Sequence, residues 1–131
     1  MRRLFLALAA PALLVSCSTT SLSSLSPAQR LYEAHGYYNI ALGVAVDYAE
    51  SRYADPGVVS ALNSANQQAV PALRYGEAFI GCAGDANSQD PIVMAANVKC
   101  AGLDLSPDNV AEQASTLKSL AKRVFKLLAG G

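Results

Sequence analysis

A serine or an aspartate stands directly before a proline four times in this chain of 131 residues. Proline is tolerated at the first position of a helix, where its missing N–H would have no partner in any case. A serine or aspartate side chain before it accepts a hydrogen bond from an unpaired amide of the first turn. Such pairs therefore predict helix starts, although they are also typical of turns. The four pairs are Ser26-Pro27, Asp55-Pro56, Asp90-Pro91 and Ser106-Pro107.

The first predicted helix runs from Pro27 to about Ala54. Gly36 and Gly43 lie within it, and each costs up to about 1 kcal/mol of helix propensity. We therefore expect another backbone to pass close to these glycines. The apolar or small residues that should face the core follow one another at steps of three and four. They are Leu31, Ala34, Tyr38, Ala41, Ala45 and Tyr48.

The second predicted helix starts at Pro56. Pro71 should kink or break it near Val70, because a proline inside a helix removes an amide and clashes with the preceding turn. The helix should then end around Gly81 and Gly84, since glycine is enriched at helix ends.

The remainder of the chain predicts two further helices. A polar loop over residues 83–90 should lead into a short helix from Pro91 to about Lys99. The last helix should start at Pro107 and keep its apolar spacing to the Gly130-Gly131 terminus. Because no strand-like alternation of useful length occurs, the sequence predicts an all-α bundle of three long helices and one short helix.

The N-terminus has the pattern of an export signal. Arg2 and Arg3 precede an apolar stretch over residues 4–15, which as a helix spans roughly 18 Å. That length is too short for a hydrocarbon core of about 30 Å and is typical of a secretory signal. The stretch ends in Leu14-Val15-Ser16-Cys17. These four residues resemble the lipobox of bacterial lipoproteins, and the resemblance covers only the first seventeen residues.

The resemblance implies that residues 1–16 are a signal peptide and that Cys17 carries lipid after cleavage. Two or three acyl chains hold a protein on a membrane essentially permanently, because each buried CH₂ contributes about 0.8 kcal/mol. In a Gram-negative host, Ser18 implies the outer membrane with the domain facing the periplasm, since the family's inner-membrane retention signal is usually an aspartate there. Residues 17–25 are then a flexible tether that spans about 16 Å, and residues 26–131 form the helical domain.

Cys82 and Cys100 remain as an even pair once Cys17 is lipidated. In an exported protein such a pair predicts a disulfide. The bridge would staple the short helix to the end of the second helix and stabilise the fold by roughly 3 kcal/mol. Metal binding or redox chemistry are the alternatives, but the chain has no CxxC motif.

Residues that carry chemistry are sparse. His35 is the only histidine, and a lone histidine needs further ligands at suitable spacing to hold zinc. The HExxH, GxSxG and phosphate-loop patterns do not occur. We therefore expect no catalytic residue, no metal and no cofactor. Without Arg2 and Arg3 the chain has eight basic residues (10 minus 2) against 10 acidic ones, and this balance gives no reason to expect nucleic-acid binding.

Two surface features are candidates for binding. Tyr37 and His35 lie beside the packing stripe of the first helix, where exposed tyrosine is favoured at interfaces; packing at the edge of the core is the alternative. The last helix carries four cations opposite its apolar face. They either meet the negative end of the helix dipole or contact lipid headgroups or an acidic partner. They are Lys118, Lys122, Arg123 and Lys126.

The sequence therefore predicts a membrane-anchored, non-enzymatic helical module of the cell envelope that interacts with an envelope protein as an accessory or scaffold subunit. One alternative is an exclusion or inhibitor factor directed at a phage, conjugation or hydrolase component. Another is a lipoprotein that binds a small ligand. Small lipoproteins of phage, prophage and plasmid origin resemble this chain in size and anchor.

Overall fold

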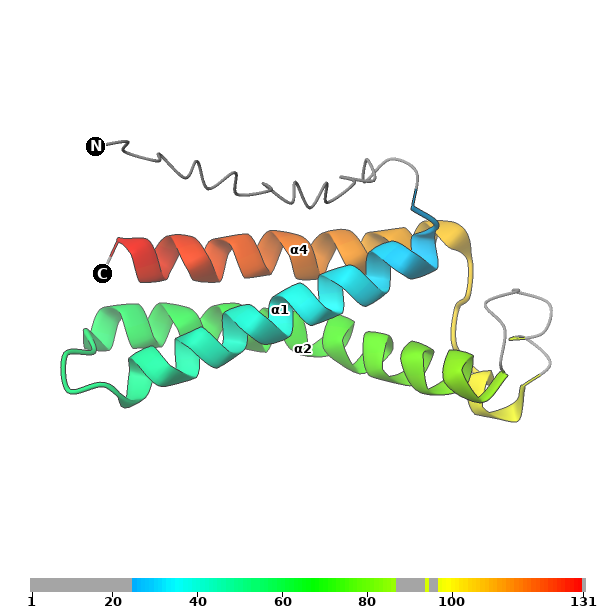
Figure 1. The fold of residues 1–131 in the computed structure, drawn as a ribbon, viewed down its shortest axis with the longest axis horizontal. Coiled ribbons are helices and arrows are strands. Elements are labelled where there is room, and N and C mark those ends of the chain that lie inside the picture. The colour runs from blue at the N-terminus through cyan, green and yellow to red at the C-terminus, as the bar shows by residue number, and fades with distance from the viewer. Residues whose placement is uncertain (1–24, 87–93, 95–96, 131) are drawn as a thin grey trace, which may run out of the picture.

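The computed structural model describes residues 25–86, Met94 and residues 97–130. Three helices pack together in it: α1 (Pro27–Glu50), α2 (Pro56–Ala86) and α4 (Pro107–Ala129). α1 and α4 run in the same direction, and α2 runs in the opposite one (Figure 1). The described ranges contain no strand, so the predicted all-α class is confirmed.

Several predictions concern residues outside these ranges. The signal peptide, the lipidation site Cys17 and nearly all of the tether precede Leu25. The short helix expected from Pro91 to about Lys99 falls mostly there as well. Of that segment, the structure gives a helical Met94 and a short 3₁₀ helix, η2 (Val98–Cys100).

Each of the three long helices begins at a predicted Ser-Pro or Asp-Pro pair. At α1 a capping box forms: Ser26 Oγ accepts from the Gln29 amide at 3.2 Å, and Gln29 Oε1 accepts from the Ser26 amide at 2.9 Å. At α2 and α4 the caps are Asp55 Oδ1 and Ser106 Oγ, which accept from amides of the first turn. The fourth pair, Asp90-Pro91, lies outside the described residues.

α1 ends at Glu50, four residues before the end predicted at Ala54. Ser51 leaves the helix in an extended conformation, while its amide donates to the Tyr48 carbonyl at 3.0 Å. The Tyr48 hydroxyl then accepts from the amide of Asp55 at 3.0 Å. Residues 51–54 therefore do not continue α1 but form the turn that places Asp55 as the cap of α2.

Of the kink or break predicted near Val70, the break does not occur, because α2 continues through Pro71, its middle residue, but a kink does. Figure 1 shows the two halves of α2 inclined to each other, which is how a helix accommodates a proline ring against the preceding turn. The predicted end around Gly81 and Gly84 is wrong, since the helix reaches Ala86. Packing of this stretch against the bundle outweighs the low helix propensity of glycine.

The core is built largely from alanine. Small side chains on facing helices let their axes approach closely, and α1 packs chiefly on α4, with α2 also packed on α4. Three large side chains are fully buried among them: Leu31, Tyr38 and Leu117. No charged side chain is buried in the described part of the chain. The buried alanines are Ala34, Ala41, Ala45, Ala65, Ala69, Ala72, Ala83, Ala114 and Ala121.

The start of α4 is fixed by Asp104. Its carboxylate accepts from the Ser106 amide at 2.9 Å, and hydrogen bonds with Ser106 lower the pKa of this carboxyl. Its backbone carbonyl accepts from the Tyr75 hydroxyl of α2 at 2.6 Å and from Asn109 Nδ2 at 2.9 Å. The entry to α4 is thereby held against α2.

A disulfide joins Cys82 of α2 to Cys100 of η2, with 5.2 Å between the two Cα atoms. Both cysteines are buried. Asn97 adds to the junction, because its Nδ2 donates to the Cys82 carbonyl at 3.1 Å. The predicted disulfide is confirmed, and it ties the connection that leads to α4 onto the end of α2.

Replacing both bridged cysteines, Cys82→Ser with Cys100→Ser, should lower the free energy of unfolding by about 3 kcal/mol, because the unfolded chain gains loop freedom. For a domain of this size the melting temperature should fall by about 10 °C. Thermal unfolding followed by circular dichroism measures this change, with reduced wild-type protein as the control. A double variant that melts with the oxidised wild type would contradict the expectation.

Candidate functional site

α1 carries an apolar row that the bundle does not cover. Tyr37, Ile40 and Val44 are 39%, 63% and 43% exposed. Their spacing of three and four residues places them on one side of the helix. Single exposed apolar residues are ordinary, whereas contiguous apolar patches are typical of surfaces that interact with another molecule. We call this side, with Gly36 and Gly43, the outer face of α1.

The two glycines leave the outer face open. A Cβ built on Gly36 or Gly43 meets no atom within 4 Å. The close backbone approach predicted for these glycines is therefore absent within the described chain, and that prediction is wrong. Their cost in helix propensity has no compensating contact there. The backbone of α1 is instead accessible to a second molecule.

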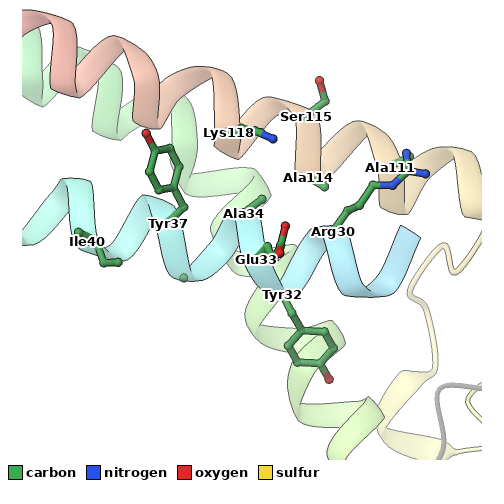
Figure 2. Close-up of a pocket in the computed structure, with 11 residues that line it drawn as sticks. Arg30, Tyr32, Glu33, Ala34, Tyr37, Ile40, Ala111, Ala114, Ser115 and Lys118 are labelled. Carbon is green, nitrogen blue, oxygen red and sulfur yellow. The ribbon is translucent and has the colours of Figure 1, made fainter. Parts of the chain in front are cut away.

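A groove of about 760 Å³ lies between α1 and α4 beside the outer face. Figure 2 shows Arg30 and Tyr37 reaching from α1 toward α4. Alanines contribute to its lining, and the charges around it sum to +1, from two basic residues and one acidic residue. The larger side chains that line it are Arg30, Tyr32, Glu33, Tyr37 and Ile40 of α1 and Lys118 of α4.

Tyr37 is held in place although it is partly exposed. Its ring centroid lies 5.4 Å from that of Phe125 in α4, with the planes tilted by 45°, within the range of an attractive aromatic pair. The adjacent Tyr38 is fully buried, and its hydroxyl donates to Asn66 Oδ1 at 3.2 Å. Burial raises the pKa of the Tyr38 hydroxyl, so it remains a donor at neutral pH.

His35 is not part of the groove. Its ring lies against α2, where a Cβ built on Gly76 would be 2.7 Å from His35 Cδ2. Its Nδ1 is 3.2 Å from Asn39 Nδ2, and its buried Nε2 has no hydrogen-bond partner among the described residues. The structure thus separates His35 from Tyr37 and makes it a packing residue between α1 and α2.

The four cations of α4 are likewise divided. Lys118 lines the groove, whereas Lys122 and Lys126 are exposed. Arg123 Nη1 donates to Gln68 Oε1 at 3.3 Å, so this residue connects α4 to α2. The basic residues therefore do not form a single cluster.

Two other kinds of site were sought in the described ranges: a metal site and a membrane-spanning helix. No group of three or more His, Cys, Asp or Glu residues there is placed to hold a metal ion. None of the described helices is both long enough and apolar enough to cross a membrane. The lipidation predicted at Cys17 lies outside the described residues.

Two residues of the outer face, Ile40 and Val44, were not foreseen as candidates. The sequence feature that could have indicated them is the seven-residue spacing from Tyr37 to Val44, with Ile40 between them. A second apolar stripe on a helix is easily taken for additional core, because both stripes have the same spacing.

Gly76→Ala tests the packing of His35. Alanine inside a helix normally gains up to about 1 kcal/mol over glycine, but here the new Cβ meets the imidazole and should lower the melting temperature. In a His35→Ala background the same change should raise it. Gly81→Ala is the matched control, because this exposed glycine of α2 has open space around it. Thermal unfolding measures all four variants, and equal gains from Gly76→Ala and Gly81→Ala in the wild type would disprove the contact.

Comparisons with known proteins found no relative. A scan against protein-family models, a search of curated proteins and a search of solved structures gave no match to this chain. No family therefore assigns a role to these residues.

Proposed function

We propose that this chain is a lipoprotein whose helical domain is a non-enzymatic interaction module of the cell envelope. It binds a helix of a partner protein along the outer face of α1 and in the adjoining groove. The observation that carries the binding role is the exposed row of Tyr37, Ile40 and Val44 beside that groove. The anchor rests on the resemblance of residues 14–17 to a lipobox.

The form of the surface favours a helix as the occupant. Amphipathic helices bind in grooves through apolar anchors spaced three, four and seven residues apart, and the outer face offers the matching spacing. Gly36 and Gly43 allow the backbone of the second helix to come near. Arg30 and Lys118 beside the groove favour a partner with acidic residues next to its apolar ones.

The anchor restricts where this partner can be. The starts of α1 and α4 lie at the same end of the bundle (Figure 1), and the proposed tether joins the domain at Leu25. From Pro27 to Ile40 the helix rises about 20 Å, and the tether adds about 16 Å. The partner helix therefore lies within a few nanometres of the membrane that holds the lipid.

In a Gram-negative host, Ser18 favours the outer membrane with the domain facing the periplasm. A short helix that starts at Pro91 and ends before Asn97 is also part of the proposed domain, because Asn97 is extended and caps η2, whose Cys100 is bridged to α2.

Small-ligand binding is the second candidate function. A volume of about 760 Å³ falls within the range of ligand sites, and Tyr32 and Tyr37 contribute to the lining. However, the apolar row continues to Val44, which is not among the lining residues. An exclusion or inhibitor factor would use the same face, and the identity of the bound protein distinguishes it from a scaffold subunit.

Cys17→Ala should release the protein from the membrane fraction, because the thiol that receives the lipid is removed. Fractionation of cells expressing each form measures the change, and the melting temperature of the released domain should match that of the wild type. If Cys17→Ala stayed in the membrane fraction and resisted a salt wash, the lipid anchor would be refuted.

Ile40→Arg should abolish the proposed binding, since it places a charge in the centre of the apolar row. Val46→Arg is the matched control: Val46 is a 46% exposed valine of the same helix, 120° away around its axis. Chemical crosslinking in intact cells followed by mass spectrometry should yield a partner with wild type and Val46→Arg, but not with Ile40→Arg. Retention of the same partner by Ile40→Arg would contradict binding at this face.

A further inference from the structure

The exposed side of α4 carries a charge pattern that is antisymmetric about its centre. Six residues lie on it at alternating steps of four and three, which places them in one row along the helix. All six are exposed. The row begins with two acidic residues, continues with two serines and ends with two lysines. Its members are Asp108, Glu112, Ser115, Ser119, Lys122 and Lys126.

We propose that this row joins two copies of the chain, with their α4 helices packed antiparallel about a two-fold axis. The positions are symmetric about the level of Leu117: 108 and 126, 112 and 122, and 115 and 119 are equally distant from it. An antiparallel copy therefore places Asp108 against Lys126 of the partner subunit and Glu112 against Lys122 of the partner subunit. The two-fold repeats both pairs, giving four contacts of opposite charge.

The charged residues of the row are available for this pairing. Within the described part of the chain, none of the four takes part in an ion pair or side-chain hydrogen bond of its own subunit. Serines at the centre are small enough for two helices to approach, and their hydroxyls both donate and accept. Figure 2 shows the Ser115 side chain pointing away from α1 at the edge of the groove, which Ser115 also lines.

Other occupants match the row less well. A parallel copy would place Glu112 against Glu112 of the partner subunit, and like charges in contact are unfavourable. An anionic lipid surface would attract the lysines but repel Asp108 and Glu112, which lie on the same side of the helix. Only a helix whose charges run in the opposite order can pair every charged residue of the row with an opposite charge. A second, antiparallel copy of the chain provides that order.

The pairing should be weak and sensitive to salt. Exposed ion pairs contribute little each and are screened by ions. Attachment of both copies to one membrane would raise their effective concentration. The row spans about 27 Å, so the two tethers would leave the dimer at opposite ends. If both lipids are in the same membrane, the bundles lie along its surface; the pairing itself does not depend on the anchor.

Charge reversal tests the pairing. The full chain, purified in a mild detergent at about 50 mM salt, should sediment as a dimer that dissociates as salt is raised. Glu112→Lys and Lys122→Glu should each weaken dimerisation at least about tenfold, because two attractive contacts become repulsive. Mixing the two variants, or combining both changes in one chain, should restore it. Glu77→Lys, an exposed residue of α2, should leave it unchanged.

Cysteine crosslinking tests the direction of packing in cells. Full-length Glu112→Cys and Lys122→Cys chains, expressed together and oxidised, should form a mixed adduct. Adducts between two 112 positions should be rare, since the axis separates them by about 15 Å. The wild type, without an added cysteine, gives the background. A monomer at low salt, a failure of the swapped charges to restore pairing, or adducts of 112 with itself or only with another protein would overturn the proposal.

Discussion

The packing of α1 on α4 is the constraint on which the rest of this structure depends. Ala34, Ala41 and Ala45 of α1 are buried, as are Ala114 and Ala121 of α4, and α1 packs chiefly on α4. Facing alanines let two helices lie close together. A bundle of three helices cannot surround α1, so the larger residues on its other side remain in contact with solvent.

An alanine core also limits stability, because a buried methyl group contributes far less than a buried leucine or phenylalanine side chain. Domains of this size are stable by only about 5–15 kcal/mol, so the roughly 3 kcal/mol expected from the Cys82–Cys100 bridge is a substantial share. Contacts at the helix surfaces add to it: His35 packs on Gly76, and Arg123 bonds to Gln68. His35 and Arg123, which the sequence offers as candidate binding residues, therefore hold helices together.

Much of the fold was predictable from local chemistry. The Ser-Pro and Asp-Pro pairs gave the starts of α1, α2 and α4, because capping and the fixed φ of proline act within one turn. The apolar spacing identified Leu31, Tyr38 and Ala41 as core. The continuity of α2 through Pro71 and its glycines was not predictable, since it depends on packing against other helices.

The surface was harder to predict than the core. Tyr37 was identified from its angle beside the packing stripe, but Ile40 and Val44 were not, because apolar spacing does not show which side of a helix is covered. The glycines suggested a close contact, and the structure places open space there. The order of charges along α4 was present in the sequence, yet its meaning depends on knowing which side of the helix is exposed.

The proposed module has two adjoining surfaces: the outer face of α1 with its groove, for a partner helix, and the charged row of α4, for a second copy. Ser115 borders both. The most direct test of the first surface is the accessibility of position 40 in native membranes. A thiol-reactive probe should label Ile40→Cys poorly in membranes and readily after purification in detergent, whereas Val46→Cys should react equally in both. Equal labelling of Ile40→Cys in membranes and in detergent would show that nothing covers the outer face, and would contradict the proposed function.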